Sequence, residues 1–333
     1  MDESFIDLSI NYDQSSSVFT TCSSKSNASF EFPIMESNSS DYAIHHLLTK
    51  LESKSIEERK QAALNIRLLS KDSNDNRLKI ARSGAIPSLI TLISSDDRQL
   101  QEYGVTSILN LSLCDENKNL IVSSGAITPL VNALRIGTTT AKENASCALL
   151  RLSQIDENKI EIGRSGAVPL LVKLLKVGDI RGKKDSSTAL YSICSIKENK
   201  IRAVQAGIVE ILIDLIADLE SNMVDKAAYV LNQVISIPEA VSAVVENDGI
   251  PVLVEMIEIG SDRQKEIAME ILLKICEGSS YRSLVVREGA IPPVVELTQC
   301  GTSRGKRKAR TLLQILRQVR TGYMAAEISD VSF

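Results

Sequence analysis

The sequence predicts an all-α protein, a right-handed α-solenoid in which about 41 residues form each repeat. One glycine register recurs with spacings of 41, 41, 41, 42 and 40 residues, at Gly84, Gly125, Gly166, Gly207, Gly249 and Gly289. A second register, 41 residues or a multiple apart, contains Gly137, Gly178, Gly260 and Gly301. No segment alternates polar and apolar residues with a period of two, so almost no strand is expected and a β-propeller is not favoured.

The first glycine register predicts a sharp corner between two helices. A short first helix, such as residues 116–124, ends at a glycine that can adopt the left-handed backbone conformation without a Cβ clash. A second helix starts at once, with Pro87, Pro169, Pro251 and Pro292 near its first turn, where an N–H is not needed. The second glycine register is expected to end this helix.

The triplet Glu-Asn-Lys recurs at 116–118, 157–159 and 198–200, where successive first helices begin. Acidic and Asn side chains at that place can cap exposed N–H groups, so a structural capping role is expected.

A longer third helix is expected after each second glycine. Its apolar residues follow a period of 3.6, as Val105, Ile108 and Leu111 do. Residues 42–70 are expected to form two helices of a terminal cap. The predicted organisation is a disordered Ser-rich tail (1–40), a solenoid (41–321, with an incomplete leading repeat at 41–72 and then six repeats) and a flexible tail (322–333).

Composition excludes several classes of function. The formal net charge is −4, so nucleic acid is not an expected partner. No apolar run approaches the roughly 18 residues of a membrane span, and none of the six cysteines forms a Cys-x-x-Cys pair. A protein of a reducing compartment, cytoplasmic and/or nuclear and most simply monomeric, is expected.

The corner sequence Gly-Ala-Ile/Val-Pro at 84–87, 166–169 and 289–292 resembles the armadillo repeat, and the resemblance covers about 280 residues. Residues 102–118, 143–175 and 181–207 are similar to the armadillo region of the plant U-box ubiquitin-ligase family. In that family the U-box recruits the ubiquitin-conjugating enzyme, and the repeats hold a substrate or regulator. The residues before the solenoid are too few for a U-box, so the resemblance implies the binding function of U-box-lacking relatives and not ligase activity.

The resemblance also implies a binding groove. Third helices of armadillo proteins line a concave face, where a Trp and an Asn on each helix can clamp an extended peptide. Phasing the third helices places the Asn-equivalent positions at Arg67, Asn110, Arg151, Ser192, Gln233, Lys274 and Gln314. The Trp-equivalent positions, one turn earlier, are Ala63, Thr106, Cys147, Thr188, Tyr229, Glu270 and Arg310.

Only Asn110 keeps the Asn of this clamp, and no position keeps the Trp. An import receptor for nuclear localisation signals is therefore not favoured. The remaining row is polar and mildly basic through Arg67, Arg151 and Lys274, which suits an extended or helical acidic segment. The alternative is that these residues are solvated helix faces. Reversing Arg151 and Lys274 to Glu is expected to weaken a ligand of the groove while leaving helicity unchanged.

The basic run at residues 304–310 is either a localisation signal or anion patch, or a solvated helix face. His45 and His46 are adjacent and point about 100° apart on a helix, which is poor geometry for a metal. No phosphate-binding loop or catalytic motif is present. No enzyme activity, cofactor or metal is therefore expected.

The predicted function is a non-catalytic scaffold or adaptor that binds a protein or peptide in the concave groove, in ubiquitin-linked or kinase signalling. One alternative is a substrate-receiving component of an E3 ubiquitin ligase whose catalytic module lies on another chain. A nuclear transport carrier is the third reading. Fold alone does not fix the partner.

Overall fold

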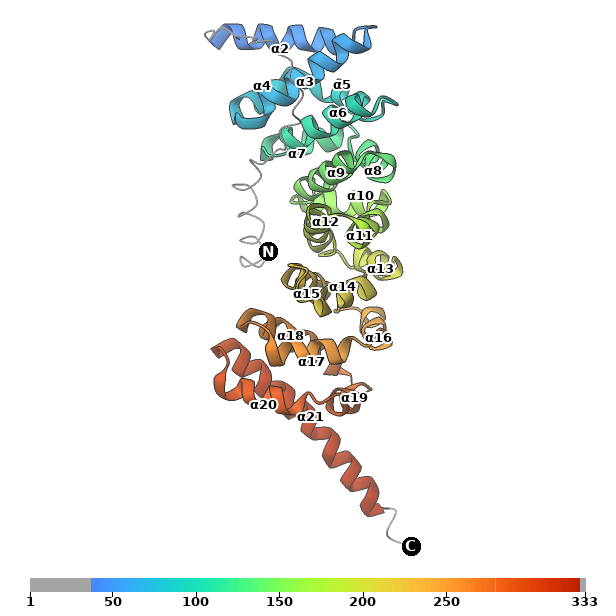
Figure 1. Cartoon of the computed structure of the whole chain (residues 1–333), viewed down its shortest axis with the longest axis vertical. Coiled ribbons are helices and arrows are strands. Elements are labelled where there is room, and N and C mark those ends of the chain that lie inside the picture. Colours follow the sequence, from blue (N-terminus) through green and yellow to red (C-terminus); the bar gives the residue numbers. More distant parts are fainter. Residues whose placement is uncertain (1–36, 279, 330–333) are drawn as a thin grey trace. The chain divides into compact units, whose positions relative to one another are not determined.

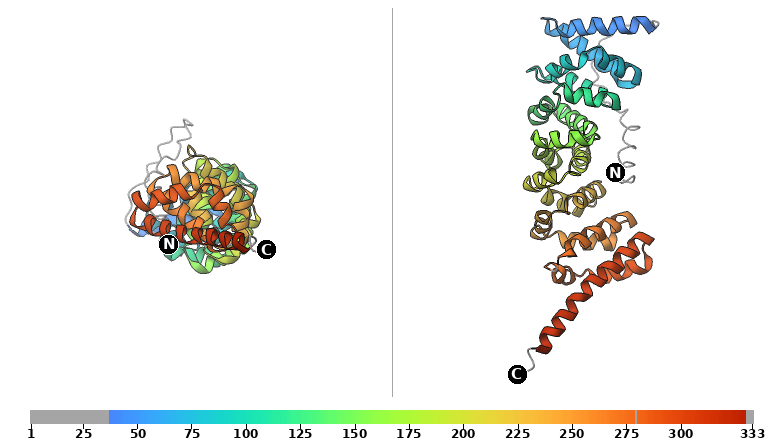
Figure 2. Two further views of the ribbon diagram at one scale, coloured as in Figure 1. Left: turned by 90° about the horizontal axis from the view of Figure 1, so that it is seen from below. Right: turned by 180° about the vertical axis from the view of Figure 1, so that it is seen from behind.

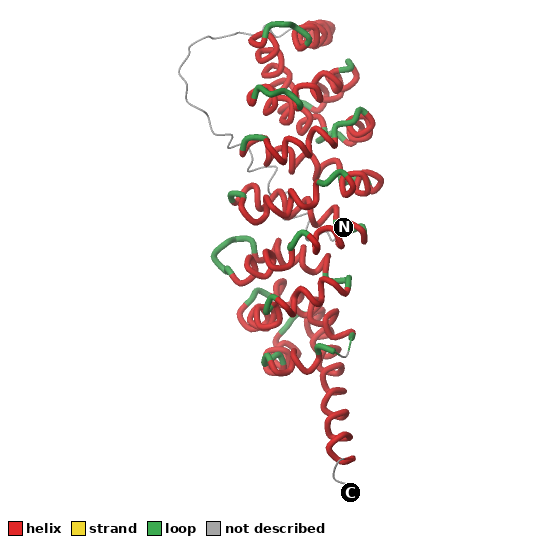
Figure 3. The backbone as a smooth tube through the Cα atoms, turned by 90° about the vertical axis from the view of Figure 1, so that its right-hand side faces the viewer, coloured by secondary structure: helices red, strands yellow, loops and turns green. Residues whose placement is uncertain are grey.

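The structure is a computed structural model that describes residues 37–278 and 280–329, which form helices joined by loops and contain no strand (Figure 3). The all-α prediction is confirmed. The chain divides into two compact units, residues 1–148 and 149–333, and the division falls within helix α9. Most of the expected N-terminal tail, residues 1–36, lies outside the described residues.

The helices are labelled in Figure 1. Unit 1 contains α2 (Ser37–Leu51), α3 (Ile56–Asp72), α4 (Asn74–Arg82), α5 (Ala85–Ile93), α6 (Arg98–Leu111), α7 (Asp115–Ser123), α8 (Ile127–Ile136) and the first part of α9 (Thr139–Leu152). Unit 2 continues with α10 (Asp156–Arg164), α11 (Ala167–Val177), α12 (Ile180–Ile193), α13 (Lys197–Gln205), α14 (Ile208–Ala217), α15 (Val224–Val234), α16 (Pro238–Glu246), α17 (Gly249–Ile259), α18 (Asp262–Glu277), α19 (Arg282–Arg287), α20 (Ile291–Cys300) and α21 (Ser303–Ser329).

Each repeat has the expected three helices, of which the third is the longest; α10, α11 and α12 have 9, 11 and 14 residues. Second helices end at Gly137, Gly178, Gly260 and Gly301, as the second glycine register predicts. Consecutive third helices pack against each other within each unit, α3 on α6 in unit 1 and α12, α15, α18 and α21 in succession in unit 2. Their buried Leu, Ile, Val and Ala side chains form the core.

The corner glycines adopt the predicted left-handed conformation at Gly84, Gly125, Gly166, Gly207 and Gly289, with φ between 79° and 84°. The prediction is wrong for Gly249. There Asp248 has a φ of 53°, and Gly249 is already the first residue of α17. A Cβ on Gly249 would lie 2.7 Å from Val244 Cγ1, so close packing of α16 on α17 explains the glycine.

The capping role expected for the Glu-Asn-Lys triplets is also wrong for the asparagines. Asn117, Asn158 and Asn199 are buried, and none of them caps an N–H group. Each is the third residue of a first helix, and its side-chain Nδ2 donates 3.0 Å to a carbonyl oxygen in the last turn of the preceding third helix. The three acceptors are the carbonyls of Leu111, Leu152 and Ile193.

Asn76 makes the equivalent bond at the start of the array, donating 3.1 Å to the carbonyl of Leu69. A helix leaves its last carbonyls without intrahelical partners, and these amides satisfy one of them at each corner. The asparagine therefore fixes the direction in which the chain leaves α3, α6, α9 and α12.

Asn199 also joins two neighbouring repeats of unit 2. The same Nδ2 donates 3.0 Å to the carbonyl of Lys159 on α10. Gly163, one turn further along α10, makes room for it, since a Cβ there would lie 1.8 Å from Asn199 Oδ1. Arg202 Nη1 donates to that oxygen at 2.9 Å, so the amide is bonded on both sides.

The N-terminal ends of neighbouring third helices are joined by polar contacts as well. Lys60 pairs with Asp97 at 2.7 Å, and the hydrogen bond to Lys60 holds the pKa of Asp97 below its usual range. The Gln264 amide donates 2.7 Å to Asp225. Each contact links one third helix to the next, so both ends of these helices are tied across the repeat boundary.

The last helix, α21, runs through the boundary expected at residue 321 and ends at Ser329. Its final part projects away from α18 and α20 (Figure 2). A flexible tail at 322–333 stays a prediction, and residues 330–333 lie outside the described ones.

Gly163→Ala is expected to destabilise the protein by about 2 kcal/mol or more, because the new methyl group displaces the Asn199 amide from its two carbonyls. At an unconstrained helical position the same exchange would stabilise by roughly 1 kcal/mol. Urea denaturation followed by circular dichroism measures the change. In the double variant Gly163→Ala/Asn199→Ala the two losses should not add, because both remove the same contact; full additivity would contradict this explanation.

Candidate protein-binding face

The candidate site lies on the third helices, whose surface within each unit is here called the third-helix face. In unit 1 these helices are α3, α6 and the start of α9; in unit 2 they are the end of α9, α12, α15, α18 and α21. The predicted groove residues all lie on these helices. Their side chains, however, differ widely in exposure and in what they contact.

Several Asn-equivalent side chains are bonded to the neighbouring third helix. In unit 1, Asn110 Nδ2 donates to the Arg67 carbonyl at 3.2 Å and to Ser70 Oγ at 3.1 Å. The Arg67 guanidinium lies over the Tyr103 ring, 5.7 Å from its centroid. The asparagine that matches the armadillo clamp thus joins α6 to α3, and its donor group already has two acceptors.

Unit 2 repeats this arrangement with different residue types. Ser192 is buried and exchanges hydrogen bonds with Ser153, with 2.8 Å between the two hydroxyl oxygens. Gln233 Nε2 donates 3.3 Å to the Cys194 carbonyl. Lys274 Nζ donates to the carbonyl and the Oδ1 of Asn232, both at 2.9 Å. The polar row that the sequence predicts therefore braces adjacent third helices.

The Trp-equivalent positions are largely covered. Thr106, Thr188 and Tyr229 are only 5%, 8% and 6% exposed, and Ala63 is fully buried. A side chain from the next repeat lies on each of the first three. Asn144 donates 2.9 Å to Thr106, Lys226 donates 3.0 Å to Thr188, and Arg263 donates to the Tyr229 hydroxyl while lying 4.9 Å from its ring centroid. Cys147 is half-buried.

Two of these covering residues, Asn144 and Lys226, belong to a register that recurs every 41 residues. Asn144, Asp185 and Lys226 are 41 residues apart and lie three residues before Cys147, Thr188 and Tyr229 on the same face of α9, α12 and α15. All three are buried polar residues. Both units thus contain third helices with a second register of buried polar residues, which phasing on the armadillo clamp did not reveal.

A buried charge cluster lies within this second register in unit 2. Asp185 is 6% exposed, and burial raises its pKa to about 6 although the charges of Arg181, Lys226 and Arg151 act in the opposite direction. Burial likewise lowers the pKa of Lys226 to about 8, against the attraction of Asp185. Arg181 Nε lies 3.7 Å from Asp185 Oδ2.

The position of Arg151 changes what we expect of the substitution Arg151→Glu, for which the sequence predicted unchanged helicity. Arg151 is half-buried at the C-terminal end of α9, where its charge acts on the Asp185 carboxyl. Arg151→Glu would bring a second carboxylate to a buried carboxylate, which is strongly unfavourable. Charge reversal at Arg151 is therefore expected to disturb folding as well as ligand binding.

The helical phase of the last third helix, α21, differs by one residue from the phase predicted from the sequence. Ala268, Ile271 and Ile275 on α18 correspond, 41 residues later, to Ala309, Leu312 and Leu316 on α21, and all six are buried. This register places the equivalents of Glu270 and Lys274 at residues 311 and 315. Arg310 and Gln314, each one residue earlier, are exposed on α21.

Glu270 is paired with the last repeat. Burial raises its pKa, but the hydrogen bond and charge of Lys308, 2.7 Å away, together with Asn232 and Lys274, outweigh burial and leave the pKa below its usual range. Lys308 also donates to the Glu266 carbonyl. Because Lys308 is so held and its neighbour Ala309 is buried, the basic run at 304–310 is part of a packed helix.

A further row was missed by the sequence analysis. One residue before each Asn-equivalent position, the third helices carry half-buried side chains that reach solvent, namely Leu109, Leu150, Tyr191, Asn232 and Leu273. Tyr191 packs edge-to-face on Tyr229 with 6.3 Å between ring centroids. Their spacing of 41 residues is visible in the sequence. Phasing on the armadillo clamp, however, selects the Asn-equivalent position one residue later.

The comparisons with known proteins agree with this architecture. The family model for the plant U-box protein ARM repeat region matches residues 179–331, and that for the armadillo/beta-catenin-like repeat matches residues 156–195. An engineered protein of known crystal structure is 26% identical, with a TM-score of 0.73 over 82% of this chain and 68% of its own. This is the armadillo-repeat fold.

Two designed armadillo repeat proteins extend the comparison. One, designed for modular peptide recognition, is 20% identical with a TM-score of 0.64 over 69% of this chain and 99% of its own. Another, in complex with the peptide (KR)4, is 20% identical with a TM-score of 0.61 over 70% of this chain and 99% of its own. At this identity the likeness shows the armadillo fold alone.

Curated plant proteins match a shorter part of this armadillo-repeat chain. U-box domain-containing protein 10 of Arabidopsis thaliana is 54% identical over 77 residues, which are 23% of this chain and 12% of that protein. The E3 ubiquitin-protein ligase SPL11 of Oryza sativa subsp. japonica is 50% identical over 70 residues, 21% of this chain and 10% of that protein. The aligned part thus spans only about a tenth of these relatives.

Within residues 37–278 and 280–329, no three His, Cys, Asp or Glu side chains are grouped as a metal site would require. No described helix combines the length and the apolar composition of a bilayer-spanning segment.

The charge cluster predicts a pH dependence of stability. The pKa of Asp185 is higher in the folded than in the unfolded state, so between about pH 4 and pH 6 the folded state binds the additional proton, and the free energy of unfolding contributed by this group falls as pH rises. The total decrease in the free energy of unfolding is roughly 2–3 kcal/mol, and it is complete above pH 6. Urea midpoints of wild type and Asp185→Asn from pH 4 to pH 7 measure it.

Asp185→Asn should lack this decrease in the free energy of unfolding between pH 4 and pH 6. The control Asp214→Asn, at an exposed position on α14, should keep it. Parallel pH profiles for wild type and Asp185→Asn would contradict the assignment.

Proposed function

We propose that this protein is a non-catalytic armadillo scaffold or adaptor that binds a polypeptide partner on its third-helix face. The observation that carries the proposal is the row of half-buried side chains that reach solvent between braced third helices, in unit 2 Leu150, Tyr191, Asn232 and Leu273. The rigid bracing underneath keeps these side chains at fixed positions, so ordering them costs little entropy on binding. Designed proteins of the same fold are named for peptide recognition, which supports this use of the surface.

The chemistry of the row suggests the class of ligand. Leu and Tyr side chains offer apolar contact, and the ammonium group of Lys274, which is bonded to Asn232, adds a positive charge beside them. An extended or helical acidic segment with apolar side chains suits this combination. The predicted role in ubiquitin-linked or kinase signalling, and a place in the cytoplasm or nucleus, belong to this proposal and are supported by similarity to plant U-box proteins.

A substrate-receiving component of an E3 ubiquitin ligase is the second candidate function, because residues 179–331 match the repeat region of plant U-box proteins. The full chain would be incubated with ubiquitin, the activating enzyme and a panel of conjugating enzymes. The adaptor proposal expects no ubiquitin chains without an added ligase. Chain formation by this protein alone would contradict it. A nuclear transport carrier is not supported, because three of the Trp-equivalent positions, Thr106, Thr188 and Tyr229, are covered by the next repeat.

The face itself is tested by affinity capture. Tagged full chain would be incubated with plant extract, and bound proteins quantified by mass spectrometry, for wild type, Tyr191→Asp/Leu273→Asp and the control Val177→Asp. Val177 is 69% exposed at the end of second helix α11, away from the third-helix face. Any partner of the face should be depleted at least about fivefold by the double variant and retained by the control.

Calorimetry with the recovered partner then gives the affinity of each variant. Equal capture by all three proteins, with circular dichroism showing that they are folded, would contradict the proposal.

A further inference from the structure

A pocket in unit 2 occurs where the asparagine brace is interrupted. Ala240 occupies the position on α16 that Asn199 occupies on α13. At the following corner, Arg282 Nε donates 2.9 Å to the Cys276 carbonyl and Nη2 donates 3.2 Å to the Glu277 carbonyl, and both bonds stay within that corner. Between the corner of α15 and α16 and that of α18 and α19 lies a cavity of about 460 Å³.

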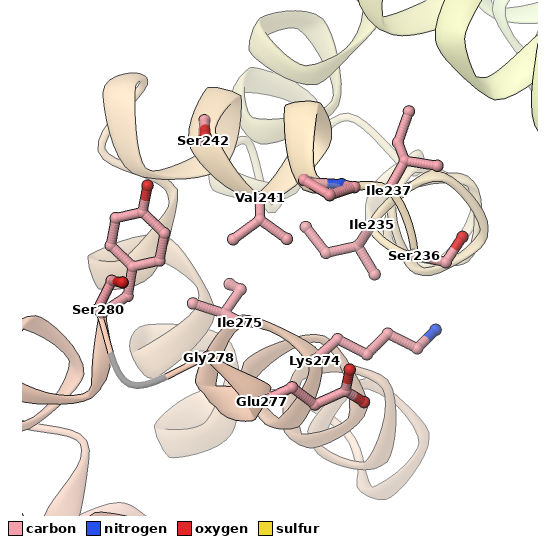
Figure 4. A pocket seen from close by; sticks show the side chains of 12 residues that line it. Ile235, Ser236, Ile237, Val241, Ser242, Lys274, Ile275, Glu277, Gly278 and Ser280 are labelled. Carbon is pink, nitrogen blue, oxygen red and sulfur yellow. The ribbon is translucent and has the colours of Figure 1, made fainter.

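The pocket has an apolar interior. Ile235 and Val241 approach it from the side of α15 and α16, and Ile275 approaches it from α18 (Figure 4). Ile237 also lines it. Tyr281 lines it at the start of α19. Its volume lies within the roughly 300–1,000 Å³ of small-molecule and side-chain pockets. Such a cavity can hold an aromatic or aliphatic side chain.

One edge of the pocket is positively charged. Lys274 lines the pocket, and Lys200 Nζ donates 2.7 Å to the hydroxyl of Ser236, another lining residue. Burial lowers the pKa of Lys200, and no described carboxylate acts on that pKa. Lys274 Nζ lies 3.9 Å from one oxygen of Glu270, whose other oxygen is bonded to Lys308. Glu270 and Glu277 thus face the three ammonium groups of Lys200, Lys274 and Lys308, so one positive charge remains.

Lys274 directs hydrogen bonds to the carbonyl and Oδ1 of Asn232, and an ammonium group has three N–H donors. Glu270 Oε1 lies 3.9 Å from Nζ, beyond hydrogen-bond distance, so a donor remains for a ligand. A carboxylate placed at this edge would gain charge-assisted hydrogen bonds from partly desolvated ammonium groups, which are stronger than those formed in water.

We propose that this pocket anchors the polypeptide ligand of the third-helix face, and that it accepts an aromatic or aliphatic side chain next to an acidic residue. The inference rests on the proposed function and adds the chemical class of the partner: an acidic peptide with an apolar anchor. Charge complementarity with Lys200 and Lys274 favours this occupant over a basic peptide, and the apolar interior favours it over a purely acidic one.

Residues 2–13 of this chain, DESFIDLSINYD, provide a probe with this chemistry, since they combine four acidic residues with Phe5, Ile6, Leu8 and Ile10 and contain no basic residue. The fluorescein-labelled peptide would be titrated with the full chain, and binding followed by fluorescence anisotropy. The full chain would carry Phe5→Ser/Ile6→Ser/Leu8→Ser so that its own copy does not compete.

Saturable binding is expected. Lys200→Gln should weaken it at least about fivefold, and Ser242→Trp, which fills the pocket from α16, should weaken it at least about tenfold. Lys173→Gln, at an exposed lysine on α11, is the matched control and should leave the affinity unchanged. A peptide with Phe5, Ile6 and Leu8 replaced by Ser, and a basic peptide of equal length, should bind at least about tenfold more weakly.

No binding of the probe, or equal affinities for the Lys200→Gln, Ser242→Trp and Lys173→Gln chains with unchanged melting temperatures, would overturn the pocket assignment. Preference for the basic peptide would overturn it as well. The proposed function fails separately, because it requires loss of captured partners by Tyr191→Asp/Leu273→Asp. If that loss is seen while the pocket variants have no effect, the face binds a partner without this anchor.

Discussion

The hydrogen bond from a buried asparagine amide to the end of the preceding third helix is the interaction on which the repeat geometry depends. A third helix exposes unpaired carbonyls at its end, and the chain must turn there into a short first helix. The asparagine satisfies one carbonyl and sets the turn at four successive corners, through Asn76, Asn117, Asn158 and Asn199. In Asn199 the same amide reaches the previous repeat, so turning and stacking are coupled.

The contacts between neighbouring third helices also limit which side chains can bind a partner. Polar side chains on the third helices could bind a ligand or join neighbouring helices, and in this protein many of them join helices. Asn110, Ser192 and Gln233 use their polar atoms across a repeat boundary. The surface left for a partner is the adjacent half-buried row and, where the asparagine is replaced by Ala240, an open pocket. The proposed binding surface therefore combines a row of side chains held by bonded third helices with a pocket where the asparagine bond is missing.

The glycine registers predicted the repeat length and the ends of most first and second helices, because a left-handed corner and a helix end place strict demands on the backbone. The exception at Gly249 arose because Asp248 can adopt the left-handed conformation and side-chain packing required the glycine one residue later. A register of glycines reports backbone position only to within about a residue.

The candidate site was less accessible to sequence reasoning. Helical phase places a side chain on a face, but it does not reveal whether the next repeat covers that face. The donors that cover Thr106 and Thr188, Asn144 and Lys226, lie 38 residues further along the chain. Likewise the asparagine of the Glu-Asn-Lys triplet looks like an N-terminal cap until its burial and its carbonyl partners are known. The role of each residue depends on hydrogen-bond partners that helical phase alone does not reveal.

The most direct measurement is the change in the free energy of unfolding for Asn158→Ala and Asn199→Ala, compared with Asn247→Ala at an exposed position at the end of α16. If buried amides set the corners, the first two substitutions should each cost roughly 2–3 kcal/mol by urea denaturation, because each leaves a buried carbonyl unpaired. Asn247→Ala should cost less than about 0.5 kcal/mol. Equal, small losses for all three variants would contradict the account.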